Sequence, residues 1–277
     1  MKNQKKRENW KFFLGTGVGA LIVIIIFSAL VIGASSPFGN RIAVINMRGT
    51  IASGPTLLSE TITPDETFSL IDKAENDPSI KAVLFVIDSP GGSVVASREI
   101  SYAVNEMSKP TVCWMGDIAA SGAYWIASSC DYVMADPLTI TGSVGVTASY
   151  LEFSKLFEKY GVTYEQITSG ESKDMGSPFR NMTSEERKKL EYIVNETFIY
   201  FLNDVKERRN LTQLQIDQIK NGDIFLGKDA VSLGLIDATG TLDDAKEKTK
   251  AMAGVENANF VTLQKKGLGL LDLLGML

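Results

Sequence analysis

The first feature of the hydropathy pattern is an uncharged apolar run near the N-terminus, Phe12–Ala34. As a helix its 23 residues would be about 35 Å long, and the hydrocarbon layer of a bilayer is ~30 Å thick. A cleaved secretory signal is the alternative, but the apolar core of such a signal is usually only ~7–15 residues long. Ile32 also stands where a cleavage site needs a small residue. The pattern therefore predicts a retained transmembrane anchor.

Beyond a short polar linker, apolar runs of strand length alternate with segments of helical periodicity. Strands are predicted at residues 42–47, 82–87, 111–115, 132–135, 144–146 and 162–167. Helices are predicted at residues 64–76, 94–107, 121–129, 151–160, 183–209, 212–221, 228–233 and 243–252. Apolar strands separated by helices are typical of an α/β fold with a buried sheet.

These patterns divide the chain into a basic segment (1–11), an anchor (12–34), a linker (35–40), a globular domain (41–266) and a tail (267–277). The tail, GLGLLDLLGML, is apolar with a single acid, and it is too short to span a bilayer. We expect it to pack against a neighbouring subunit. Occupation of an apolar groove is the alternative.

Charge is distributed unevenly along the chain. The first 40 residues carry five cationic side chains against one acid, a net charge of +4; the whole chain has −5, so the remainder has −9. The cations precede the apolar run, and positive residues keep their end of a membrane helix in the cytoplasm. The domain is therefore predicted to lie outside the cytoplasm. Without a basic patch on this acidic domain, nucleic-acid binding is not expected.

The two cysteines, Cys113 and Cys130, are too few for a disulfide framework. Cys113 lies in a predicted buried strand and Cys130 at the end of a predicted helix, so we expect two buried thiols. A location outside the cytoplasm would permit a bridge between them, and this alternative stays open.

The chain contains no histidine. This absence excludes Ser-His-Asp and Cys-His catalysis and every His-ligated metal site. Two cysteines far apart in sequence also cannot form a Cys-rich zinc site. Nucleophilic chemistry would have to combine a Ser, Thr, Cys or Lys nucleophile with a lysine or carboxylate base. We expect no metal or cofactor.

Three segments rich in small residues carry the candidate chemistry: DSPGGS (88–93), GDIAASGA (116–123) and SGESKDMGS (169–177). The first two each join a predicted strand to a predicted helix, where glycines let backbone N–H groups approach an anion. Ser121 opens its helix, and the positive end of the helix dipole would favour a developing alkoxide. Ser121 could equally be an ordinary helix cap, and residues 88–93 only a turn.

The third segment places Lys173 in a predicted loop. Most loop lysines are solvated and have no chemical role. Lys173 could act as a base only where burial removes water from its amine, because desolvation favours the neutral form. No Ser-x-x-Lys sequence occurs, so the arrangement of the penicillin-binding proteins is absent.

Four motifs between about Arg41 and Leu242 closely resemble the signal peptide peptidase A family in its short, single-domain form. They are VIDSPGGSV, GDIAASGAYWIA, ITGSVGV and TSGESKDMGSPFR, in family order. The resemblance implies a Clp-protease/crotonase-like ββα superhelix behind the transmembrane helix. It implies Ser121 as nucleophile and Lys173 as general base of a Ser/Lys dyad. Ser143, in ITGSVGV, would orient the lysine amine.

The same resemblance implies an oxyanion hole formed by Gly91, Gly92 and the N–H of Gly122. It implies a closed ring of subunits, octameric in short members, in which neighbours contribute the serine and the lysine of one site. Remnant signal peptides are the substrate class of the family. The expected protein is thus a serine endopeptidase that acts on apolar peptides near the membrane surface.

Two other functions compete with this one. The fold alone would allow a crotonase-like acyl-CoA hydratase. Such an enzyme would need carboxylates in its pocket and cytoplasmic coenzyme A, and the predicted topology argues against both. A non-catalytic membrane scaffold on a decayed peptidase fold is the second alternative. The presence of both Ser121 and Lys173 in their motifs argues against it.

Overall fold

The computed structural model describes residues 39–55 and 60–264. The predicted anchor at 12–34, the basic segment and the tail at 267–277 lie outside the described residues. Within the described ranges, none of the helices has both the length and the hydropathy that a membrane crossing requires.

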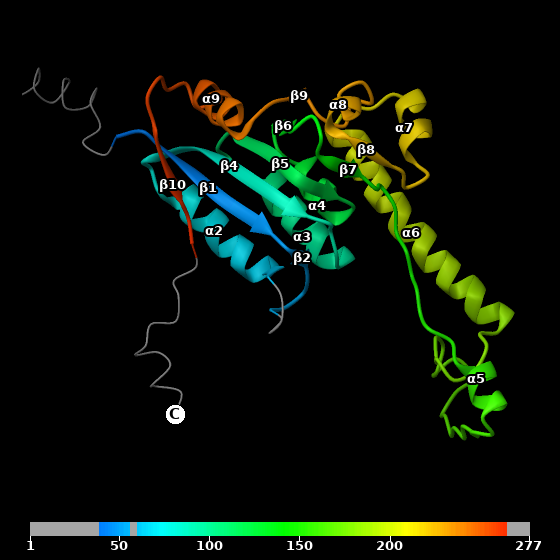
Figure 1. Cartoon of the computed structure of the whole chain (residues 1–277). Helices are drawn as coiled ribbons and strands as arrows, with labels where there is room; N and C mark the ends of the chain where they lie inside the picture. The colour runs from blue at the N-terminus through cyan, green and yellow to red at the C-terminus, as the bar shows by residue number, and fades with distance from the viewer. Residues whose placement is uncertain (1–38, 56–59, 265–277) are drawn as a thin grey trace, which may run out of the picture.

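The described part of the chain is built on a sheet of eight strands. Its main path runs β10-β1-β4-β5-β6-β9, with every neighbouring pair parallel (Figure 1). The strands are β1 (Arg41–Arg48), β4 (Ile80–Ser89), β5 (Thr111–Ala120), β6 (Tyr132–Ala135), β7 (Ile140–Gly142), β8 (Ile224–Leu226), β9 (Ala238–Thr239) and β10 (Asn259–Thr262). β7 pairs with β5 and, antiparallel, with β8. β2 (Thr50–Ile51) and β3 (Thr61–Ile62) form a separate parallel pair.

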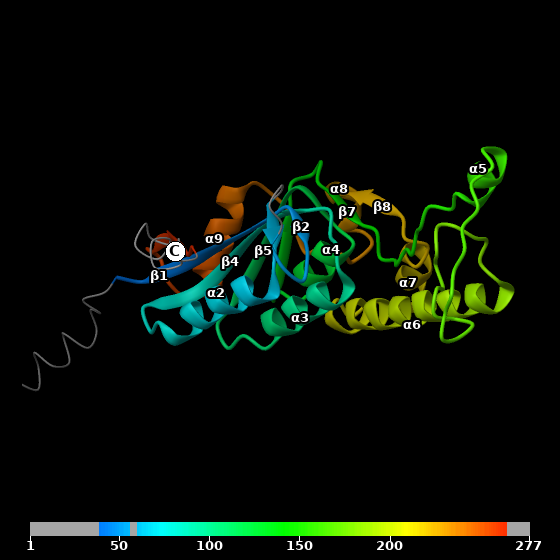
Figure 2. The ribbon, with the colours of Figure 1, turned by 90° about the horizontal axis from the view of Figure 1, so that it is seen from below.

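Helices cover both faces of the sheet. The helices of the described residues are α2 (Pro64–Asn76), α3 (Val94–Asn105), α4 (Gly122–Ala127), α5 (Ser154–Lys159), α6 (Ser184–Arg208), α7 (Gln213–Ile219), α8 (Gly227–Ala230) and α9 (Leu242–Met252). Figure 2 shows α2 and α3 on one face and α9 on the other. The result is a mixed α/β domain, as the sequence predicted.

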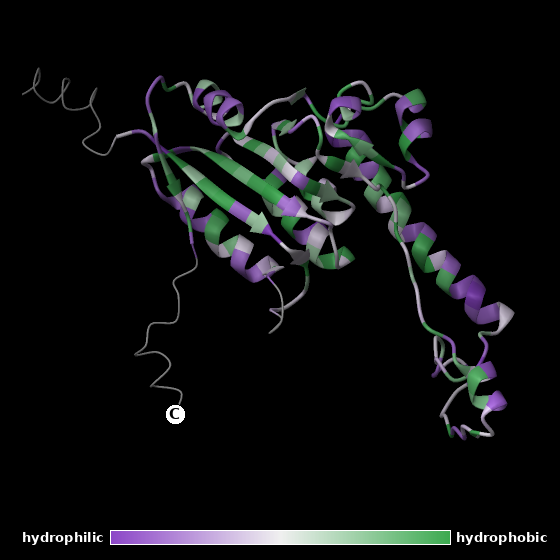
Figure 3. Ribbon diagram, in the orientation of Figure 1, coloured by the Kyte–Doolittle hydropathy of each residue, from purple (hydrophilic) through white to green (hydrophobic). Residues whose placement is uncertain are grey.

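The central strand β4 shows why its sequence is continuously apolar. Val83, Phe85 and Ile87 pack into the cluster that includes α2, α3 and α4. The alternate residues at 82, 84 and 86 pack into a second cluster beneath α9. Because side chains of a strand point alternately to opposite faces, a strand buried on both sides needs apolar residues throughout. Figure 3 shows this apolar band along the central strands.

Most predicted elements are confirmed, and the exceptions have local causes. Residues 162–167 form no strand and are exposed throughout, because no neighbouring strand pairs with them. The strand predicted at 144–146 lies earlier, at Ile140–Gly142, and it ends where Gly142 and Ser143 adopt positive φ angles of 83° and 51°. β5 continues through residues 116–120, which the sequence had assigned to a loop.

The long helix α6 leads away from the sheet (Figures 1 and 2). Its C-terminal half is held against the domain, where Phe201 and Val205 are buried. The first part of α6, to residue 193, projects from the domain together with residues 148–183, which include α5. We call this extension the arm (residues 148–193). The arm displays exposed apolar side chains, among them Leu151, Tyr160 and Ile167.

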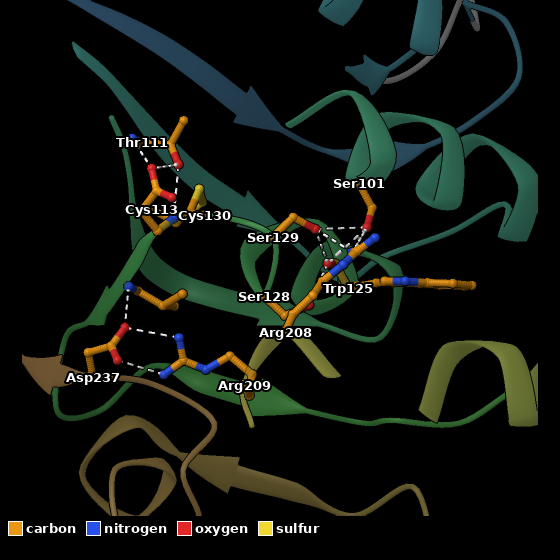
Figure 4. The surroundings of a disulfide bond; sticks show 12 residues. Ser101, Thr111, Cys113, Trp125, Ser128, Ser129, Cys130, Arg208, Arg209 and Asp237 are labelled. Carbon is orange, nitrogen blue, oxygen red and sulfur yellow. Dashed lines mark hydrogen bonds and ion pairs between the residues drawn. A yellow bond between two sulfur atoms is a disulfide. The ribbon is translucent and has the colours of Figure 1, made fainter. Parts of the chain in front are cut away.

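Cys113 and Cys130 form a disulfide bond, with their Cα atoms 5.8 Å apart (Figure 4). The expectation of two free thiols was therefore wrong, although both residues are buried, with exposures of 0% and 6%. α4 turns the chain back after β5, and this reversal returns Cys130 to the strand that holds Cys113. Two hydrogen bonds from Thr111 to the Asp131 carboxylate, at 2.8 and 2.9 Å, fasten the same junction.

Candidate active site

Ser121 lies in the turn between β5 and α4 with φ 55° and ψ −127°. A positive φ is unfavourable for a residue with a side chain and costs of order 1–3 kcal/mol, so the surrounding structure must enforce it. One restraint is the hydrogen bond from the Ser121 N–H to the Gly142 carbonyl, at 2.9 Å. Since α4 has only six residues, the N–H groups around the turn matter more here than a helix dipole.

The DSPGGS turn packs directly against Ser121, because parallel neighbours β4 and β5 end at the same edge of the sheet. A Cβ atom at Gly91, where φ is 96°, would lie 2.9 Å from Ser121 Cβ and 2.8 Å from Gly122 N. Only glycine fits this position. The first two candidate segments are therefore brought together.

The three proposed oxyanion-hole glycines are not equivalent. The Gly91 N–H already donates a hydrogen bond to Ser89 Oγ, at 3.1 Å. The N–H groups of Gly92 and Gly122 make no hydrogen bond to another group in the described residues. A Cβ at Gly122 would lie 3.5 Å from Gly92 N, so these two donors are close neighbours beside Ser121. Gly92 and Gly122 are the pair available to an oxyanion, and Gly91 provides the close approach.

Ser143 follows β7, whose pairing with β5 aligns Gly142 with Ala120. Its φ is 51°, and its N–H donates to the Asp223 carbonyl, at 2.8 Å. In the described ranges, three non-glycine residues have positive φ, and Ser121 and Ser143 are two of them. Strained backbone is concentrated at functional sites. The third motif is thus placed beside the first two.

Ser121 and Ser143 open into one cavity of about 590 Å³. Its remaining lining residues are Pro90, Gly92, Val94, Gly145, Val146, Thr147, Val194, Asn195, Phe198, Lys220, Asn221 and Gly222. The valines and Phe198 form apolar walls suited to apolar side chains of a ligand. Sequence reasoning missed the residues from α6 and from the turn after α7, since no motif marks them.

Lys173 does not line this cavity. It lies in the arm and is exposed, and its amine makes no hydrogen bond or ion pair within residues 39–55 and 60–264. One chain therefore does not bring Lys173 to Ser121. The lysine that does line the cavity is Lys220, an exposed residue at its rim whose ammonium is paired with Asp217, at 2.7 Å.

A polar network joins the Ser121 helix to α6 (Figure 4). Trp125 of α4 donates from Nε1 to Asp204 of α6, at 2.9 Å, and stacks on Phe201 with ring centroids 4.5 Å apart. Arg208 donates to the hydroxyls of Ser101 and Ser129. These contacts fix α6, and with it one wall of the cavity, relative to the serine turn.

A strained serine at the end of a buried strand lies in front of a cavity, beside two N–H groups that make no hydrogen bond in the described part of the chain. These are the features of the site of a serine hydrolase. Comparison with known proteins narrows this class. Residues 103–256 match the model of peptidase family S49. The chain belongs to this family and is a serine peptidase.

Several relatives carry names consistent with this membership. A protein of Methanocaldococcus jannaschii, provisionally named a protease, is 39% identical over 205 residues, which are 72% of this chain and 66% of that protein. Protease 4 of Haemophilus influenzae is 34% identical over 77% of this chain but only 35% of its own length. A protein of Enterococcus faecium, provisionally named signal peptide peptidase SppA, is 32% identical over 86% of this chain and 70% of that protein. The chain therefore spans about a third of protease 4 and about two thirds of the other two.

Among solved structures, the fold resembles the 1510-N membrane-bound stomatin-specific protease. A serine-to-alanine variant of that protease has a TM-score of 0.56 and 16% identity, covering 82% of this chain and 99% of the other. A lysine-to-alanine variant in complex with a substrate peptide has a TM-score of 0.55 and 17% identity, covering 86% and 99%. At these identities the likeness bears on the mixed α/β fold alone.

Proposed function

We propose that this chain is a membrane-anchored serine endopeptidase that cleaves remnant signal peptides and other apolar peptides outside the cytoplasm. Ser121 is the nucleophile, and Lys173 of a neighbouring copy is the general base. The main observation behind this proposal is that the motifs lie in two separate places of the structure. Ser121, Ser143 and the glycine turn share one cavity, whereas Lys173 is presented on the arm of the same chain.

The arm supports the sharing of sites between copies. A general base must come within about 3 Å of the hydroxyl it deprotonates, or act through one water. Histidine is absent from the sequence, so another residue must supply this group. Exposed apolar side chains on the arm, such as Leu151, Tyr160 and Ile167, favour its burial against a second copy. A closed ring, octameric as in short members of the family, remains the expected assembly.

The proposed reaction follows from these positions. The neutral amine of Lys173, oriented by Ser143, accepts the Ser121 proton as the hydroxyl oxygen attacks a peptide carbonyl. The N–H groups of Gly92 and Gly122 stabilise the oxyanion of the tetrahedral intermediate. The lysine then protonates the leaving amine, and an acyl-enzyme remains. Water, activated by the same amine, releases the acyl group.

The cavity supports a preference for small or apolar residues. Val94, Val146, Val194 and Phe198 present apolar walls beside the nucleophile. Signal peptides have apolar cores, and an anchored enzyme would meet their remnants at the membrane surface. The proposed steps require neither a metal nor a nucleotide.

The location and the finer fold are part of the same proposal. The apolar run at 12–34 would anchor the domain, and the cations before it would keep the N-terminus in the cytoplasm. The Cys113–Cys130 bridge supports an oxidising compartment, since disulfides rarely persist in the cytosol. The parallel sheet is compatible with the ββα superhelix implied by the family resemblance.

Mixed assemblies of the detergent-solubilised full chain test the proposal. Ser121→Ala and Lys173→Met should each abolish cleavage of an apolar peptide, and Ser121→Ala should also abolish labelling by a serine-directed acylating probe. Refolding the two variants together should restore part of the activity, because some sites then pair an intact serine with an intact lysine. Lys220→Met is the matched control and should remain active. Substantial activity of Lys173→Met, or loss of activity only in Lys220→Met, would contradict the assigned base.

A further inference from the structure

Lys173 is exposed, yet the chain on both sides of it is tied down. Residues 171–176 form consecutive turns, in which the Lys173 N–H donates to the Gly170 carbonyl, at 3.1 Å. The Ser177 N–H donates to the Asp174 carbonyl, at 2.8 Å. Turns of this kind restrict the backbone locally but do not fix its position relative to the rest of the arm. Other contacts supply that position.

The main contact is the guanidinium of Arg180. Its Nε and Nη2 donate to the two carboxylate oxygens of Asp174, at 2.6 and 2.7 Å. Its Nη1 and Nη2 donate to the two oxygens of Glu186, at 2.9 and 2.5 Å. Arg180 thus bridges the residue next to Lys173 and the first turn of α6.

All five N–H bonds of the guanidinium are used in this bridge. The fifth goes from Nη1 to the Asn181 carbonyl, at 3.0 Å. A lysine at position 180 would keep the charge, but its three donors on a single nitrogen cannot form two bidentate pairs. Geometry, rather than charge alone, is what arginine provides here.

The other end of the bridge is rigid. Glu186 is 2% exposed, and its carboxylate also accepts the Thr183 N–H, at 2.9 Å, within the capping box of α6. On the other side of Lys173, the Ser172 hydroxyl accepts from Lys189, at 2.8 Å. Both neighbours of Lys173 are therefore attached to the beginning of the longest described helix.

We propose that Arg180 is a positioning residue for Lys173: through Asp174 it holds the lysine loop against α6, so that the arm presents the amine in a fixed place. The inference rests on the proposed function, since it concerns the lysine assigned there as general base. Arg180 itself touches neither the serine nor the cavity. Its effect on catalysis passes through the position of the base.

Arg180→Lys is the first test. Displacement of a catalytic group by about 1 Å can cost 10²-fold in rate, so kcat should fall by about tenfold to a hundredfold. KM should stay within about twofold, because the cavity walls come from outside the lysine loop. Asp174→Asn should have a similar effect, and the double variant should be no worse than either single variant, since all three break one link. Arg41→Lys is the matched control, because Arg41 pairs with Asp77, at 3.1 Å, at the start of β1.

Mixed assemblies then show through which residue Arg180 acts. Arg180→Lys mixed with Ser121→Ala should regain activity, because the second variant supplies intact lysine loops. Arg180→Lys mixed with Lys173→Met should gain nothing, since neither variant supplies an intact loop. Recovery in the second mixture, or an unchanged kcat in both Arg180→Lys and Asp174→Asn, overturns the inference. If Arg180→Lys does not assemble, Asp174→Asn replaces it in both mixtures.

The variants distinguish a failure of the positioning role from a failure of the proposed function. If Lys173→Met is inactive while Arg180→Lys and Asp174→Asn are fully active, the proposed function holds and Arg180 has no positioning role in it. A fully active Lys173→Met enzyme overturns the base assignment and the positioning role together.

Discussion

Removal of the Cys113–Cys130 disulfide should lower stability strongly and activity weakly. The bond closes a segment with a sequence separation of 17, and the tip of this segment carries Ser121. In the chain-entropy description, closing a loop of this length reduces the entropy of the unfolded chain by an amount worth about 3 kcal/mol at 25 °C. Replacing both cysteines by alanine should therefore cost about 3 kcal/mol in the free energy of unfolding.

Urea denaturation of the assembled protein, followed by tryptophan fluorescence, measures this cost. With an m value of about 3 kcal/mol/M, the midpoint should fall by about 1 M in Cys113→Ala/Cys130→Ala. Wild-type protein with reductant is the control for the lost sulfur atoms, and it should show nearly the same midpoint as the double variant. The single variant Cys113→Ala should match both.

Activity in the absence of urea should change by less than about threefold. The serine turn is also held by the pairing of β5 with β4 and β6 and by the Thr111–Asp131 hydrogen bonds, which do not need the disulfide. Equal midpoints with and without reductant would refute the stabilising role assigned to the bond. A large loss of activity at unchanged midpoint would show instead that the bond shapes the site directly.

Two further outcomes are expected. Gly91→Ala should lower the free energy of unfolding by about 1–3 kcal/mol and abolish most peptidase activity, because a Cβ there would lie 2.9 Å from Ser121 Cβ. Thermal melting and a peptide-cleavage assay measure the two effects, and wild-type behaviour in both would contradict this packing. Hydrogen bonds from Arg180 lower the pKa of Glu186 from 4.5 to about 2. The stabilisation that the ionised carboxylate gives is therefore complete above pH 4.5 and is lost as the pH falls toward 2. Protection of the amides of residues 169–186 against hydrogen exchange, relative to the intrinsic rate at each pH, should decrease over that window, and in Glu186→Gln it should be low already at pH 7.

Much of the fold could be predicted because its signals are local. The apolar runs of β4 and β5 identify strands buried on both faces, and the glycine-rich segments after them identify turns. Parallel neighbours end at one edge of the sheet, so the meeting of Gly91 with Ser121 follows from strand order. The short strands β8, β9 and β10 have two to four residues each, too few for any periodicity to emerge.

The parts of the site that were missed depend on tertiary geometry. Val194, Asn195 and Phe198 line the cavity because α6 crosses the domain at a particular angle, which the Trp125–Asp204 contact helps to set. No spacing within the sequence of α6 reports that angle. The disulfide is a similar case, since its formation depends on how sharply α4 turns the chain back after β5.

The wrong strand at residues 162–167 shows a more general limit. Alternating apolar residues indicate that one face of a segment is buried, but not which molecule buries it. In the described chain these residues are exposed, and they lie on the same arm as Lys173. Under the proposed function, both observations have one explanation. An arm that completes the site of a neighbouring copy needs an apolar surface for that copy, and its lysine makes no pair within the described part of its own chain. Under the proposed function, the hydropathy of the arm reports burial against a neighbouring copy, and the identity of that partner is what a single chain does not encode locally.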